Sequence, residues 1–144
     1  MAVVLRTEAF DPWAELAAAP NGGLQPGQYG ATCAFTGTMR DFNEGESVEA
    51  MFLEYYPGMT ERQLEAIVGE QIHEHGLLAA QVIHRVGTIQ PGETIVLVAT
   101  WSAHRRAAFD GTRAIMEALK HRAPFWKRET RGHADAWVQG NTAG

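Results

Sequence analysis

Two lysines are the residues of this chain whose type and spacing best suit catalysis. Lys120 and Lys127 are the only lysines, and both belong to a basic segment that includes Phe125 and Trp126. A lysine close to a second cation and to aromatic side chains loses its proton more readily, because its charged form is repelled and desolvated. The free amine can then serve as a nucleophile or a general base. In the alternative interpretation, Lys120 only complements the carbonyls at a helix C-terminus, and the residues alone favour neither.

A second pair, His104 and Arg105, is predicted to stand in the first turn of the helix that ends beyond Lys120. Backbone N–H groups at a helix N-terminus lack partners within the helix, and phosphate binds well there. Arginine and histidine add charge-assisted donors, although the histidine could equally cap the helix or pack. Cations here oppose the helix macrodipole at a cost of about 0.3–1 kcal/mol. That cost favours a functional role, and the pair indicates an anion site.

The helix that would carry these residues is predicted over 103–122, with Ser102 as its N-cap and with Pro124 preventing its continuation. One stripe of this helix is small and apolar, which suits packing on a sheet. The opposite stripe mixes cations with large apolar side chains, which suits a partner or a flat anionic molecule. A second core layer or a contact between two copies would also explain it. The first stripe contains Ala108, Gly111, Ile115, Ala118 and Leu119, and the second contains Arg106, Phe109, Arg113, Met116 and Lys120.

The remaining elements predict one α+β domain over residues 1–144 with a mainly antiparallel sheet. Residues 1–28 are predicted to be an irregular arm in which only 11–19 can form a short helix, and residues 139–144 a frayed tail. Apolar alternation and turn residues define the elements between them. Two strands come first, over 29–40 and 48–56, and a helix follows that begins with a Thr60–Gln63 capping box and ends at Gly76. A hairpin of strands 79–86 and 94–101 turns at 90–93. The helix over 103–122 and two short strands within 125–138 complete the chain.

Charge and composition narrow the class of protein. The chain has 144 residues and a formal net charge of −5, and residues 1–72 carry −8 against +3 for residues 73–144. The single cysteine, Cys33, cannot form an intrachain disulfide, and no signal sequence is recognised, so we expect a cytoplasmic protein. No apolar run reaches the roughly 18 residues of a membrane helix. We therefore expect no membrane partner.

The sequence predicts neither a metal nor a cofactor. His73 and His75 would project about 200° apart on a helix, so they cannot chelate one ion, and Cys33 is more readily a small core residue than a nucleophile. Two other function classes stay open. A nucleic-acid-binding module is disfavoured by the overall acidity and by the lack of a recognised motif. An unrelated phosphate-ester enzyme would work without a protein partner.

Five motifs of the chain resemble the large, catalytic subunit of molybdopterin synthase. The resemblance covers residues 29–138 and implies an α/β hammerhead-type fold with an added small antiparallel β subdomain. Its most specific parts are the His-Arg pair and the Lys-to-Trp-Lys block. The motifs are Phe35–Arg40, Leu53–Met59, His84–Gly87, Ser102–Arg105 with Ala108-Phe109, and Leu119-Lys120 followed by Pro124–Glu129.

The resemblance also implies an activity and partners. An enzyme of this family converts cyclic pyranopterin monophosphate into molybdopterin. It transfers two sulfurs from the thiocarboxylate at the C-terminal Gly-Gly of a small ubiquitin-like subunit, without a cofactor. The large subunits form a central dimer within a heterotetramer, and a second copy can complete the phosphate pocket.

Site residues follow by the same resemblance. Lys120 and Lys127 match the catalytic lysines of the family. Other positions match residues that hold or line the anionic substrate, some of them through the backbone. These are Thr38, Met39, Arg40, His104, Arg105, Arg128 and Glu129.

Overall fold

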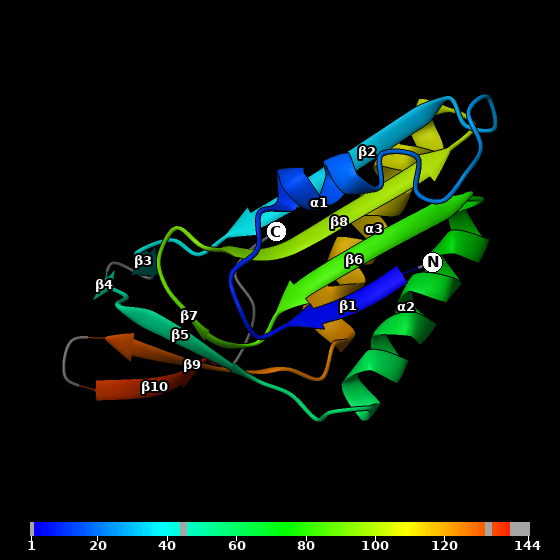
Figure 1. The fold of residues 1–144 in the computed structure, drawn as a ribbon. Helices are drawn as coiled ribbons and strands as arrows, with labels where there is room; N and C mark the ends of the chain where they lie inside the picture. Colours follow the sequence, from blue (N-terminus) through cyan, green and yellow to red (C-terminus); the bar gives the residue numbers. More distant parts are fainter. Residues whose placement is uncertain (1, 44–45, 132–133, 139–144) are drawn as a thin grey trace.

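A four-stranded main sheet organises the molecule, in the order β1-β6-β8-β2. The structure is a computed structural model that describes residues 2–43, 46–131 and 134–138. Helices α2 and α3 cover one face of this sheet and α1 lies on the other (Figure 1). The strands are β1 (Ala2–Arg6), β2 (Ala31–Thr38), β6 (Ala79–Arg85) and β8 (Thr94–Ser102), and the helices are α1 (Pro12–Ala18), α2 (Met59–His75) and α3 (Arg105–Arg122).

A smaller sheet, in the order β10-β9-β5-β7, lies beside one end of the main sheet (Figure 1). Every pairing within it is antiparallel, and in the main sheet only β1 and β6 run parallel. The predicted α+β class, the mainly antiparallel sheet and the added small β subdomain are therefore confirmed. The further strands are β3 (Phe42–Asn43) and β4 (Glu46–Ser47), which pair with each other, and β5 (Ala50–Glu54), β7 (Gly87–Ile89), β9 (Trp126–Arg131) and β10 (Ala134–Val138).

The prediction of an irregular arm over residues 1–28 is wrong at its beginning. Ala2–Arg6 form the edge strand β1, with Val4 opposite Ile83 of β6. Val3 and Leu5 pack against the main core, and this burial, rather than any local turn signal, orders the segment. The short helix of the arm is confirmed as α1. The predicted frayed tail, 139–144, lies outside the described residues.

Both long helices begin differently from the prediction. Gly58, not Thr60, is the N-cap of α2, and its backbone N–H donates to the Glu61 carboxylate at 3.0 Å. Ser102 is the last residue of β8, because its backbone pairs with Ala31, and His104 takes the N-cap position of α3. The predicted ends are confirmed, at Gly76 for α2 and at Arg122 for α3.

The apolar stripe of α3 packs on the main sheet as predicted. Ala108, Ile115 and Leu119 are buried, and Ala118 is half-buried. At Gly111 an added Cβ would lie 2.7 Å from the Leu77 side chain, so this glycine lets the helix approach closely. The core has a part between the helices and the main sheet and a second part, around Met51 and Leu53, under the small sheet. None of the helices in the described ranges is long and apolar enough to cross a bilayer.

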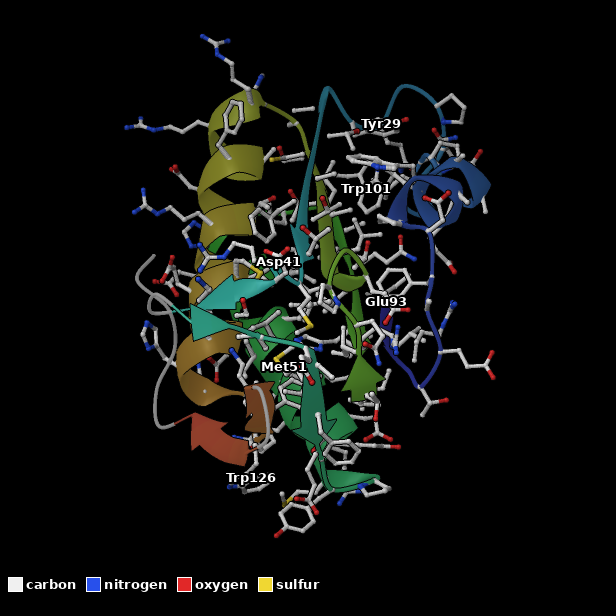
Figure 2. All side chains as sticks on the ribbon, turned by 90° about the vertical axis from the view of Figure 1, so that its left-hand side faces the viewer. Tyr29, Asp41, Met51, Glu93, Trp101 and Trp126 are labelled. Carbon is white, nitrogen blue, oxygen red and sulfur yellow. The ribbon has the colours of Figure 1, made fainter. Side chains whose placement is uncertain are left out.

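On the other face of the main sheet, the N-terminal segment packs over Trp101. The Trp101 indole N–H donates to the Pro20 carbonyl at 3.0 Å, and Tyr29 bonds to Asn21. Figure 2 shows Trp101 and Tyr29 between the sheet and this segment. Gly22 crosses the indole with a φ of 59°, and a Cβ there would lie 2.5 Å from the ring. The buried Trp101 is thus the centre of the contacts that hold the segment on the sheet.

We expect Gly22→Ala to lower the free energy of unfolding by about 3 kcal/mol, since it adds a clash with a buried ring to the strain of a positive φ. Gly23 is the matched control, because its φ is also positive, at 84°, but nothing lies within 4 Å of its added Cβ. Gly23→Ala should cost only about 1 kcal/mol. Urea unfolding measures both. Equal losses would show that the contact with Trp101 does not matter.

Candidate active site

Lys120 lies in the last turn of α3 and lines a surface pocket of about 280 Å³. The pocket is formed by one face of α3 and by side chains of β2. Much of its wall is apolar, and Phe35 and Phe109 are 41% and 65% exposed. The mixed stripe predicted on α3 therefore faces a pocket, with Arg106 as the member that does not line it. The lining residues are Cys33, Phe35, Phe109, Thr112, Arg113, Met116, Glu117 and Lys120.

Four of these wall residues are not among those predicted from the sequence: Cys33 and Phe35 on β2, and Thr112 and Glu117 on α3. Cys33 is a half-buried free thiol in the pocket wall rather than a core residue, and Phe35 lies two positions further along β2. Residues two apart in a strand share a face, so the spacing was a usable signal. Which face of β2 meets α3 was not readable from the sequence.

The end of α3 that carries Lys120 is tied to α2. The Arg122 guanidinium forms two hydrogen bonds with the Glu70 carboxylate, at 2.6 and 3.1 Å, which lowers the pKa of Glu70. The Gln63 side chain donates to the Arg122 carbonyl at 3.1 Å. These surface contacts join the last turn of α3 to α2.

Lys127 is the second residue of β9 and lies opposite Leu53 of β5. Directly opposed residues of an antiparallel pair point to the same face, so Lys127 shares the face of the buried Leu53. Trp126 points to the other face, where its ring meets Tyr56 edge-on at 4.9 Å (labelled in Figure 2 at the lower end). The Lys127 side chain is half-buried on the inner side of the small sheet.

His84 is a buried titratable group on this inner side. Its ring stacks on Phe125 with centroids 4.4 Å apart, and its Nδ1 donates to the Arg85 carbonyl at 2.7 Å. Burial, assisted by the nearby charge of Lys127, lowers the pKa of His84 to about 4, although the hydrogen bond to the Arg85 carbonyl acts in the opposite direction. His84 is therefore a neutral ring at neutral pH, close to the Lys127 cation.

Backbone hydrogen bonds fix the turn that follows β2, where three of the predicted residues lie. They are Thr38, the last residue of β2, and Met39 and Arg40 directly after it. The Met39 N–H donates to the Glu93 carbonyl at 2.9 Å, and its carbonyl accepts from the Gly92 N–H at 2.8 Å. The Met39 side chain is buried under the small sheet, whereas Arg40 is exposed. The buried Arg85 forms an ion pair with Glu93 at 3.5 Å (Figure 2 labels Glu93), which fixes the same turn. Arg40 thus extends from a rigid backbone.

His104 and Arg105 lie at the opposite end of α3 from Lys120 (Figure 1). Arg105 opens the helix and Lys120 is in its last turn, so about 22 Å of helix axis separates them. Both residues of the pair are exposed, and the His104 side chain makes no cap hydrogen bond. One chain therefore does not bring all the predicted substrate-binding residues to one place.

Arg128 and Glu129 belong to β9, opposite Phe52 and Met51 of β5. Their side chains lie outside the described part of the structure. Within that part, no group of three or more histidine, cysteine, aspartate or glutamate residues is arranged to hold a metal ion.

The low pKa of His84 predicts a dependence of stability on pH. Between pH 6.5 and about 4 the unfolded chain binds a proton at His84 that the folded protein does not, so stability falls as the pH falls through this range. The loss from this one group approaches about 3 kcal/mol at pH 4. His84→Phe removes the titrating group and should flatten this part of the curve in urea titrations run from pH 4 to pH 7. Parallel curves for the two proteins would contradict the assignment.

Comparisons with known proteins identify the family to which this chain is similar. Residues 5–122 match the family described as MoaE protein. The chain is 47% identical over 142 residues to the molybdopterin synthase catalytic subunit of Pseudomonas aeruginosa, covering 97% of this chain and 91% of that protein. The subunit of the same name from Escherichia coli is 50% identical over 110 residues, or 76% of this chain and 73% of that protein.

Solved structures show the same fold. The molybdopterin biosynthesis MoaE protein of Burkholderia ambifaria is 40% identical, with a TM-score of 0.78 over 100% of this chain and 93% of that one. Molybdopterin synthase from Staphylococcus aureus is 26% identical, with a TM-score of 0.80 over 95% of each chain. The chain therefore belongs to the MoaE family, whose members include the catalytic subunits of molybdopterin synthase.

Proposed function

We propose that this chain is the catalytic subunit of molybdopterin synthase, a sulfurtransferase of molybdenum cofactor biosynthesis. It converts cyclic pyranopterin monophosphate into molybdopterin with two sulfurs from the thiocarboxylated C-terminus of a small ubiquitin-like subunit. The observation that carries the proposal is the placement of the only two lysines, Lys120 in the wall of a largely apolar pocket and Lys127 on the inner face of the small sheet, joined by a short linker. The names of the relatives support it.

Sulfur transfer from a protein thiocarboxylate requires lysine amines that the C-terminus of the small subunit can reach. A Gly-Gly end has no side chains, so its thiocarboxylate can approach the lysines closely, and their positive charge attracts it. Each transfer breaks a carbon–sulfur bond of the thiocarboxylate and a carbon–oxygen bond of the pterin, and it forms a carbon–sulfur bond on the pterin, from which the displaced oxygen leaves with a proton. The acyl carbon is then taken by a lysine amine, or by water whose proton an amine accepts. Both roles need a lysine without its proton.

Replacing either lysine tests this assignment. We expect Lys120→Ala and Lys127→Ala each to lower dithiolene formation about 100-fold or more in an assay with thiocarboxylated small subunit and pterin precursor. Lys→Arg variants keep the charge but not a titratable amine, so they should stay inactive if an amine reacts.

Arg122→Ala is the matched control, because this exposed cation ends the same helix but is bound to Glu70. It should retain activity within about twofold, since surface ion pairs contribute little to stability. Undiminished dithiolene formation in both lysine-to-alanine variants would refute the proposal.

We also propose that two copies of the chain share each active site, within a heterotetramer that has one small subunit per large subunit. The separation of about 22 Å along α3 supports this, because a compact fused-ring pterin cannot touch both ends of the helix. His104 and Arg105 of one copy then hold the phosphate of a substrate that lies at Lys120 and Lys127 of the other. The remaining binding positions are Thr38, Met39, Arg40, Arg128 and Glu129.

Mixed dimers provide the test. Lys120→Ala and Arg105→Ala homodimers should both be nearly inactive. After unfolding and refolding together in equal amounts, half of the dimers contain one chain of each kind, and each of these has one intact site. The mixture should recover about a quarter of wild-type activity. If each site lay within one chain, no intact site could form and the mixture would stay inactive.

The proposal also includes the cellular compartment and the domain organisation of the protein. The free thiol of Cys33 in the pocket wall supports a reducing compartment, the cytoplasm. Phe125 packs against both parts of the core, which supports one domain over the whole chain.

A further inference from the structure

The linker between the two lysines is fixed at a single aromatic residue. Pro124 cannot continue α3, and the Phe125 N–H turns back to donate to the Ala123 carbonyl at 2.9 Å. The Phe125 ring packs against both parts of the core. One of its faces is covered by the His84 imidazole, with an angle of 26° between the ring planes. The position of this ring therefore decides where β9 begins.

The His84 ring is itself held in one orientation. It is 8% exposed on β6, and the hydrogen bond from its Nδ1 to the Arg85 carbonyl fixes the rotation of the ring. A flat ring in a fixed plane specifies the orientation of a stacked partner, which a branched aliphatic side chain of similar volume does not. The neutral state of His84 also avoids a second cation beside Lys127.

We propose that His84 is a positioning residue for Lys127, acting through its stack on Phe125, two residues before the lysine. The inference rests on the proposed function only in so far as Lys127 takes part in sulfur transfer. His84 is not among the residues that line the pocket beside β2. It sets the path of the chain that leaves α3 and so the point from which the Lys127 amine extends.

The composition of the chain permits a direct measurement of this effect. Because Lys120 and Lys127 are the only lysines, protein labelled with ¹³C-lysine gives two sets of side-chain NMR signals, which Lys120→Arg and Lys127→Arg assign. In His84→Leu we expect the Lys127 signals and their titration midpoint to shift while those of Lys120 stay in place. Loss of core packing alone would leave both lysines unchanged or move both.

Kinetics give a second readout. In the assay with thiocarboxylated small subunit, His84→Leu should lower kcat about tenfold, because small displacements of a reacting group cost rate, while KM for the small subunit changes less than twofold. His84→Phe restores a flat ring and should recover kcat to within about threefold of wild type. Ile83→Val is the control, since Ile83 is fully buried next to His84 on the opposite face of β6. It should change neither kcat nor the Lys127 signals.

Phe125→Leu removes the other ring of the same stack, so it can replace His84→Leu in the test if that variant does not fold. It should reproduce the shift of the Lys127 signals, and adding His84→Phe to it should cause no further shift. Lys127 signals that are unchanged in both His84→Leu and Phe125→Leu, or equal kcat losses in His84→Leu and Ile83→Val, would overturn the inference. If Lys127→Ala were fully active, the proposed function of Lys127 would fail, while the NMR shifts would still decide whether His84 positions it.

Discussion

The close packing of α3 on the main sheet is the constraint on which the candidate site depends. Gly111 lets the helix approach Leu77, in the link before β6, so closely that an added Cβ would lie 2.7 Å from the Leu77 side chain, and this contact keeps the small face of the helix inward. With this face fixed, the opposite face must present Phe109, Arg113 and Lys120 to the pocket beside β2. The burial of small residues on one side thus determines the chemistry on the other.

The end of the same helix joins the two sheets. Arg122 ties its last turn to Glu70, and three residues later Phe125 enters both parts of the core. The lysines on either side of this junction belong to different elements, one helical and one in a strand. Their relative position is therefore set by side-chain packing across the junction rather than by the geometry of a single helix or strand.

Periodicity predicted the parts of the molecule that local rules control. The stripe around Ile115, the end of α3 before Pro124 and the two short strands within 125–138 were predicted because apolar spacing, proline and turn residues act locally. Helix starts were missed where pairing partners decide: Ser102 looks like a cap, but Ala31 extends β8 through it. The strand at Ala2–Arg6 was missed because its partner, β6, is distant in the chain. Residue types indicated the two lysines and the His104-Arg105 pair, and the resemblance added the other site residues. Only the structure shows Cys33 in the pocket wall.

The parallel pairing of β1 with β6 has a consequence for the order in which the molecule assembles. Ala2 lies opposite Gln81, so β1 leaves the ribosome well before its partner strand β6 has been made. Contacts between residues this distant close a long loop and form late in folding. Val3 and Leu5 therefore stay exposed until β6 has formed. Because β8 pairs with both β6 and β2, these three strands can form a sheet before β1 joins its edge.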